Sequence, residues 1–188
     1  MNIRGKVLSL RAIEERDLDL LQKWANDPTT QSGIGEIHFP SSMDFHKSWF
    51  QKLKDDRLNQ RFVVDVPEVG IIGISSILNI DWRNRHAWHG LVLGDASHRG
   101  KGYGVDAILA TMRYAFEELN LERLDGSIIE YNKISISTYC GKKVGWKEEG
   151  RRRNYFFRNG KYWDQIIVGC TKQDYLELIE ETNYWVLG

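Results

Sequence analysis

A glycine-rich turn between an apolar segment and an amphipathic segment constrains the fold of this chain more than any other feature. Residues 91–94 read Leu-Val-Leu-Gly, and residues 99–104 read Arg-Gly-Lys-Gly-Tyr-Gly. Apolar side chains then recur at helical spacing over residues 103–119, which predicts a helix with one buried face. Residues 123–129 alternate as a strand. A strand, a helix and a second strand in this order normally give a parallel strand pair with a right-handed crossover.

The rest of the chain predicts further strands and helices around this unit. Strands are predicted at 7–11, 61–66, 71–80, 88–94 and on both sides of a turn at 158–161. Helices are predicted at 17–26, after an N-cap at Ser42, after Asn132 and at 172–182. For a chain of 188 residues, we expect one domain over 1–188. Its class is α/β or α+β, with a mixed, mostly antiparallel sheet of about seven strands flanked by helices.

The glycine-rich turn is suited to an anion. Glycine permits positive φ, and the first turn of a helix carries unpaired N–H donors and a partial positive charge. A diphosphate therefore fits this position, and Arg99 and Lys101 would add charge-assisted contacts. A tight turn with a purely structural role would use similar glycines. A P-loop is excluded because Gly102 follows Lys101, and a dinucleotide-binding domain because no early strand-helix-strand unit with an acidic partner occurs.

The sequence resembles the GNAT acetyltransferases. Residues 99–104 match that family's Arg/Gln-x-x-Gly-x-Gly/Ala signature, and residues 74–144 follow its central order of strands and helices. Matches to the RimJ/RimL-like branch extend over nearly the whole chain; they are Leu8 and Arg11 followed by Asp17-Leu18, the pair Asn132 and Ser135, Gly145-Trp146-x-x-Glu149-Gly150, and Asn159-Gly160-Lys161-Tyr162-x-Asp164. The resemblance implies an acetyl-CoA-dependent N-acetyltransferase whose splayed parallel strands form the acyl-CoA cleft.

The same resemblance implies which residues hold the cofactor. Val92, Leu93 and Gly94 would offer backbone groups to the pantetheine arm. The diphosphate would be held by the turn and the start of the helix, which are His98, Arg99, Gly100, Lys101, Gly102, Tyr103, Gly104 and Val105. Asn132 resembles the asparagine with which the family contacts the cofactor, and Ser135 accompanies it. Asn132 is equally suited to cap the following helix, and both roles can hold at once.

Direct transfer to an amine needs a proton donor for the departing thiolate and a base for the amine. Tyr139 is the candidate acid, because it follows Asn132 at the spacing of the family's tyrosine. The distance from Tyr139 to Gly145 is longer than in the family and implies an insertion, so an ordinary packed aromatic stays an alternative. Candidate bases are His89, Glu130 and Asp81, and a chain of water molecules is a further alternative.

The sequence leaves the amine acceptor open. A nucleotide-linked amino sugar, a protein N-terminus, and a polyamine or amino antibiotic all fit the resemblance. The run Arg151-Arg152-Arg153 favours the amino sugar slightly, because it could receive a diphosphate, although such runs usually lie in solvated loops. A non-catalytic acyl-CoA-binding module is the alternative of another class.

Charge and composition limit the other partners. The chain has 26 Lys and Arg against 26 Asp and Glu, so a nucleic-acid partner is not expected. The two cysteines and five histidines are scattered, and no metal is expected. The chain has no long apolar run and no secretory leader pattern, so we expect no membrane partner and a cytoplasmic location. A homodimer is compatible with the sequence, which does not fix the oligomeric state.

Overall fold

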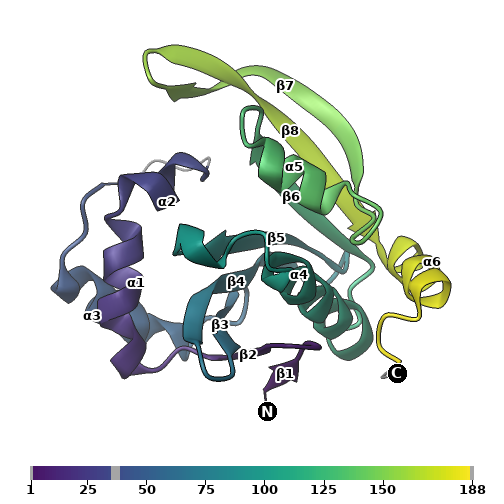
Figure 1. Ribbon diagram of the computed structural model, residues 1–188, viewed down its shortest axis with the longest axis horizontal. Coiled ribbons are helices and arrows are strands. Elements are labelled where there is room, and N and C mark those ends of the chain that lie inside the picture. Colours follow the sequence, from purple (N-terminus) through teal and green to yellow (C-terminus); the bar gives the residue numbers. More distant parts are fainter. Residues whose placement is uncertain (1, 35–38, 187–188) are drawn as a thin grey trace.

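The computed structural model describes residues 2–34 and 39–186, and its frame is an eight-stranded sheet with the order β1-β2-β3-β4-β5-β6-β8-β7 (Figure 1). The strands are β1 (Ile3–Arg4), β2 (Ser9–Ala12), β3 (Gln60–Val66), β4 (Gly70–Asp81), β5 (His86–Leu93), β6 (Arg123–Ile129), β7 (Lys147–Arg158) and β8 (Lys161–Thr171). Neighbouring strands are antiparallel, except that β5 and β6 are parallel. The predicted mixed, mostly antiparallel sheet is confirmed. Its additional strand is β1, which is too short to show an alternating pattern.

The helices flank this sheet. They are α1 (Leu18–Ala25), α2 (Pro28–Ser32), α3 (Met43–Leu53), α4 (Tyr103–Arg113), α5 (Lys133–Tyr139) and α6 (Lys172–Thr182), with 3-10 turns η1 (Glu15–Asp17) and η2 (Ala96–His98). The predicted helix over 103–119 changes its hydrogen bonding after Arg113, where η3 (Tyr114–Glu118) continues it as a π-helical turn. None of the helices in the described ranges is long and apolar enough to cross a membrane.

Side-chain caps explain where several helices begin. Ser42 accepts a hydrogen bond from the backbone of Phe45 at the start of α3, as predicted. Asp27 accepts from the backbone of Thr29 and Thr30, and Pro28 occupies the first turn of α2. The sequence predicted one helix over residues 17–26, which ends before Asp27-Pro28. The same two residues begin a further short helix, because proline is tolerated in a first helical turn.

Both faces of the sheet are covered. The consecutive residues Val63 and Val64 of β3 are each 0% exposed, so side chains on opposite faces are buried. Val63 packs with Leu18, Leu21 and Trp24 of the N-terminal helices. Val64 lies in a second cluster with residues of α4. Helix α4 therefore covers one face, and α1 and α3 lie on the other (Figure 1).

The parallel pair β5 and β6 separates along its length. Their register covers only His86–Trp88 against Arg123–Asp125. Beyond these residues β5 continues beside β4 up to Leu93, and β6 continues beside β8 up to Ile129. The predicted splayed parallel pair is confirmed, and the splay opens between two strands that are each supported on their other edge.

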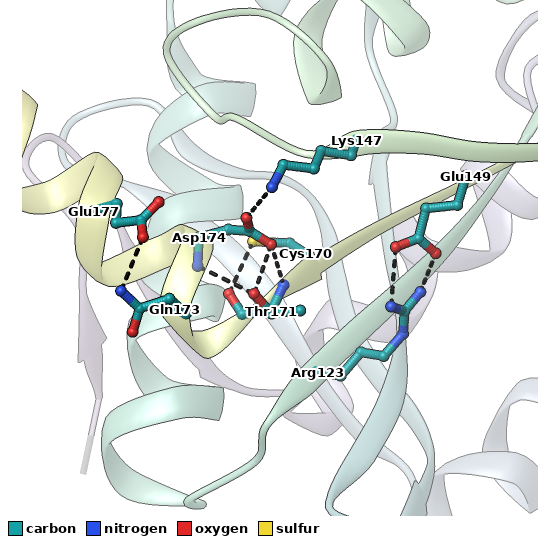
Figure 2. Close-up of polar contacts among 8 residues, drawn as sticks. All are labelled: Arg123, Lys147, Glu149, Cys170, Thr171, Gln173, Asp174 and Glu177. Atoms are coloured by element: carbon teal, nitrogen blue, oxygen red, sulfur yellow. Dashed lines mark hydrogen bonds and ion pairs between the residues drawn. The ribbon is translucent and has the colours of Figure 1, made fainter.

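A polar cluster fixes the C-terminal half to β6. The Arg123 guanidinium forms a paired contact with the Glu149 carboxylate of β7, and Lys147 pairs with Asp174 of α6 (Figure 2). Asp174 also accepts from the backbone N–H of Thr171, 2.9 Å away, in a capping box that starts α6. These contacts hold the β7–β8 hairpin, and with it one wall of the splay, in a defined position.

Candidate functional site

The glycine-rich turn forms the entrance to α4 with a left-handed backbone. Gly100 has φ of 76° and Gly102 has φ of 84°, a region that side chains with a Cβ atom rarely adopt. A Cβ atom at either glycine would meet no atom within 4 Å, so the backbone angle and not crowding calls for glycine. Gly102 is the N-cap of α4, and the first N–H groups of the helix lack intrahelical acceptors. These donors lie beside the exposed Arg99 and Lys101.

A first cavity, of about 350 Å³, lies between the end of β5 and the starts of α4 and α5. Its lining combines apolar side chains of β5 with polar groups of α2 and α5. Several predicted cofactor residues line it, namely Val92, Leu93, Arg99, Gly104, Asn132 and Ser135. Gly100, Lys101, Gly102, Tyr103 and Val105 belong to the adjoining turn and helix start but are not among its described lining residues.

Gly94 and His98, two further predicted cofactor residues, lie at the end of β5 and in the turn that follows it. A Cβ atom at Gly94 would lie 2.0 Å from the Trp24 ring, and the Gly94 carbonyl accepts from the Thr30 hydroxyl at 2.9 Å. Gly94 therefore attaches the N-terminal helices to the end of β5. His98 closes η2 and is half-buried. Neither residue is among those that line the first cavity.

A second cavity, of about 980 Å³, lies on the other side of the splay. Aromatic side chains form much of its wall, and they come from β5 and from the β7–β8 hairpin; they are Trp88, Tyr155, Phe156, Phe157 and Tyr162. Asn79, Ser127 and Gln165 add uncharged polar groups. Among its described lining residues there is no carboxylate.

The two cavities meet at one set of residues. Gly33, Ile34, Leu91, Val92, Asn132, Ser135 and Tyr139 line both cavities. Tyr139 is the member of this set with an acidic proton, since the others have apolar, amide or aliphatic hydroxyl side chains. A group transferred from one cavity to the other would therefore pass beside Tyr139.

Tyr139 and His89 form a buried pair at this meeting point. Tyr139 Oη lies 2.9 Å from His89 Nδ1, and His89 Nε2 lies 3.2 Å from Ser75 Oγ. Burial raises the pKa of Tyr139 and lowers the pKa of His89 to about 3. At neutral pH the tyrosine is therefore protonated and the histidine uncharged.

The three candidate bases lie in different surroundings. Both ring nitrogens of His89 are engaged in the buried contacts above, so neither is left for direct contact with an amine. Glu130 pairs with Arg151 at 2.9 Å and is not among the residues that line either cavity. Asp81 accepts hydrogen bonds from the backbone of Arg83 and Asn84 in its own loop. The structure does not bring Glu130 and Asp81 to the meeting point.

Asn132 does more than the sequence indicated. Its Oδ1 accepts from the Ser135 N–H and caps α5, and its Nδ2 donates to the Gly33 carbonyl at 3.0 Å. The neighbouring Tyr131 hydroxyl donates to the Ser32 carbonyl. These two contacts join the end of α2 to the start of α5 across the splay; we call them the α2–α5 bridge.

Sequence reasoning missed Ser75 and Thr111, whose hydroxyls lie 2.7 Å apart behind His89. Both residues are 0% exposed. Each could have been recognised from the sequence, since Ser75 is a polar residue inside an apolar strand and Thr111 lies on the buried face of a helix. Such residues are usually hydrogen-bonded in the core.

Comparisons with known proteins agree with this geometry. Residues 8–145 match the sequence model of a family described as an acetyltransferase (GNAT) domain. Spermidine N(1)-acetyltransferase of Vibrio cholerae is 29% identical over 173 residues, which are 92% of this chain and 98% of that protein. The ribosomal protein uS5-alanine N-acetyltransferase of Escherichia coli is 26% identical over 112 residues, or 59% of this chain and 56% of that protein.

A solved structure is similar over nearly the same length. The crystal structure of the Vibrio cholerae spermidine N-acetyltransferase in complex with CoA and spermine superposes with a TM-score of 0.84 at 27% identity. The match covers 92% of this chain and 99% of that one.

Proposed function

Because the chain belongs to the GNAT acetyltransferase family, we propose that its two cavities bind acetyl-CoA and a primary amine and that the acetyl group passes directly between them at Tyr139. The observation that carries this proposal is the meeting of both cavities at one buried tyrosine. The thioester supplies an activated acyl group. The protein contributes two adjoining sites and a proton donor.

We assign acetyl-CoA to the first cavity. The free N–H groups at the start of α4 and the positive side chains of Arg99 and Lys101 suit the diphosphate. Val92 and Leu93 lie beyond the residues at which β5 pairs with β6. The backbone groups on that edge of β5 are therefore available to the amides of the pantetheine arm. Asn132 and Ser135 line the opposite wall.

We assign the amine acceptor to the second cavity. Aromatic faces attract an ammonium group through their negative quadrupole, and the wall formed by Trp88, Tyr155, Phe157 and Tyr162 supplies several such faces. Gln165 adds a directed acceptor: its Nε2 donates to Ser127 at 2.6 Å, while its buried Oε1 has no hydrogen-bond partner in the described part of the chain. An amine N–H would satisfy that oxygen.

Within this assignment we propose a polyamine or a similar small aliphatic amine as the acceptor. The sequence favoured an amino sugar because of the run at residues 151–153. Those arginines lie on β7, outside the described lining of both cavities, and Arg151 pairs with Glu130 and Asp164. The run at residues 151–153 therefore does not supply a diphosphate site in the second cavity, whose described lining includes a different arginine, Arg158. Similarity to a spermidine N-acetyltransferase supports the polyamine.

A thiol-release assay with an amine panel tests the acceptor. The panel comprises spermidine, spermine, a nucleotide-linked amino sugar and peptides with a free N-terminal alanine or serine. We expect the polyamines to give the highest kcat/KM. Turnover restricted to the amino sugar or to the peptides would contradict the polyamine assignment. Binding of CoA in calorimetry, with no thiol release from any amine, would instead indicate a non-catalytic acyl-CoA-binding module.

Gln165→Leu is expected to raise the KM for the amine roughly tenfold, because a hydrogen bond to a charged group contributes about 1.5–3 kcal/mol. The KM for acetyl-CoA should not change, since Gln165 lines only the second cavity. Steady-state kinetics with each substrate varied in turn measures both constants. Gln60→Leu is the matched control, because Gln60 is a partly buried glutamine of β3 whose amide bonds to Asp56. Equal effects of the two substitutions would contradict the role of Gln165.

A further inference from the structure

A chain of four buried polar side chains runs from the meeting point of the cavities into the core. Tyr139 Oη lies 2.9 Å from His89 Nδ1, His89 Nε2 lies 3.2 Å from Ser75 Oγ, and Ser75 Oγ lies 2.7 Å from Thr111 Oγ1. The Thr111 hydroxyl then donates to the Ala107 carbonyl at 2.8 Å. The four side chains come from α5, β5, β4 and α4, and none is more than 7% exposed. Water therefore has little access to replace any of these bonds.

Counting hydrogens shows which side chain donates and which accepts at each step of this hydrogen-bonded chain. A carbonyl only accepts, so the single hydrogen of the Thr111 hydroxyl goes to Ala107. Ser75 must then donate to Thr111, which leaves its oxygen as the acceptor for His89 Nε2–H. A neutral imidazole carries one N–H, so His89 Nδ1 is an acceptor and takes the Tyr139 hydrogen.

The opposite direction makes one hydrogen bond fewer. If Thr111 donated to Ser75, then Ser75 would donate to His89 Nε2, and His89 Nδ1–H would donate to Tyr139. Every contact along the chain would persist except the bond from Thr111 to Ala107. That single bond therefore selects the direction, and it lies at the end of the chain most distant from the cavities.

We propose that His89, Ser75 and Thr111 are positioning residues that set the direction of the Tyr139 O–H bond, so that in the resting protein the hydroxyl donates to His89 Nδ1 and offers only its oxygen lone pairs to the cavities. The neutral state of His89, which its burial enforces, is consistent with this arrangement. Thr111 thus acts on Tyr139 through two intervening side chains.

This inference rests on the proposed function for its catalytic meaning. As the acetyl group moves, a C–N bond forms and the C–S bond breaks; the Tyr139 proton goes to the sulfur, and the proton that the amine nitrogen loses restores the Tyr139 hydroxyl. The lone pairs of the Tyr139 oxygen can accept a hydrogen bond from an N–H of the amine. For Tyr139 to protonate the sulfur, its hydrogen must turn away from His89 about the Cζ–Oη bond. The positioning chain therefore controls when the proton is available.

The tautomer of His89 tests the inference without any turnover. In ¹⁵N-labelled protein, long-range ¹H–¹⁵N correlation spectra distinguish the protonated from the bare ring nitrogen, and the loss of one ring in His89→Gln assigns the signals. We expect the Nε2–H tautomer in the wild type. In Thr111→Val the direction should reverse, since Ser75 loses its acceptor and turns its hydrogen to His89 Nε2, which gives the Nδ1–H tautomer.

Thr182→Val is the matched control, because the Thr182 hydroxyl also donates to a backbone carbonyl four residues earlier, that of Leu178 in α6. Thr182 does not belong to the hydrogen-bonded chain that includes His89. It should keep the wild-type tautomer. Ser75→Ala removes the acceptor of Nε2–H and should also give the Nδ1–H tautomer, which provides a second variant if Thr111→Val does not fold. A wild-type Nδ1–H tautomer, or an unchanged tautomer in both variants, would overturn the proposal. Because the spectra need no acetyl transfer, this result is independent of whether the proposed acceptor is correct.

Discussion

Replacing Tyr139 with phenylalanine is expected to lower kcat for acetyl transfer about 100-fold, within the range that a positioned acid or base contributes. The substitution removes the one acidic proton at the meeting point of the two cavities. The ring remains, so its edge-on contact with Trp146, at 5.0 Å between centroids, is kept. The KM for acetyl-CoA should therefore change little. Steady-state thiol release with saturating amine measures both constants.

Tyr175→Phe is the control for this experiment. Tyr175 is also fully buried, and its hydroxyl donates to Glu117 at 2.6 Å and accepts from Trp185. Both variants lose a buried hydrogen bond, which costs about 1–3 kcal/mol of unfolding free energy. Only Tyr139→Phe should lose activity. A kcat in Tyr139→Phe equal to that of the control would remove Tyr139 from the reaction.

Replacing Gly102 with valine is expected to raise the Kd for CoA tenfold or more. A side chain with a Cβ atom pays about 1–2 kcal/mol in the left-handed region, and the φ of 84° at Gly102 sets the direction of the first N–H groups of α4. Relaxation of this strain would turn those donors away from the diphosphate, and a change of about 1.4 kcal/mol corresponds to a tenfold change in affinity. Isothermal titration calorimetry with CoA measures it.

Gly70→Val provides the comparison. Gly70 has φ of 90° and open space around its Cβ position, as Gly102 has, but it is the first residue of β4, where it pairs with Val66 of β3. The two variants should lose similar stability in thermal unfolding, and only Gly102→Val should lose affinity. Unchanged CoA binding in Gly102→Val would show that the turn has a purely structural role.

The central unit of the fold was predictable because local patterns and tertiary structure agree there. Residues 123–129 and 172–182 were predicted as a strand and a helix, and β6 (Arg123–Ile129) and α6 (Lys172–Thr182) have these bounds. Both segments carry apolar residues at the period of their element. The glycine-rich turn was equally predictable, because positive φ at Gly100 and Gly102 favours glycine, and closely spaced glycines are easily recognised in a sequence.

Other elements depend on contacts that a local pattern does not contain. Strand β7 begins at Lys147, well before the predicted strand around residue 155. It is an edge strand with charged, exposed side chains, and its register with β8 shifts twice, so no alternation of apolar residues marks its first half. The run at residues 151–153 suggested an anion site because its local pattern does not show the carboxylates that pair with Arg151. These are Glu130, directly after β6, and Asp164 of β8.

The polar chain behind Tyr139 shows the same limit within the site. His89 was singled out from its titration range, but its contacts with Ser75 and Tyr139 join residues far apart in sequence. Only the packing of α4 and α5 against β4 and β5 brings the four side chains into line. That packing also changes the role of His89 from a base to a positioning residue in our proposal.

The α2–α5 bridge has a consequence for the order of events. Gly33 and Asn132, the partners of one of its bonds, line both cavities, so the bridge stands over the place where the cavities join. From there one cavity extends toward Arg99 and the other toward Tyr162. In our assignment the thioester occupies the first cavity and the amine the second, so we expect that neither substrate has to bind first. We therefore expect random-order addition, in which a dead-end inhibitor bound in one cavity still permits binding in the other.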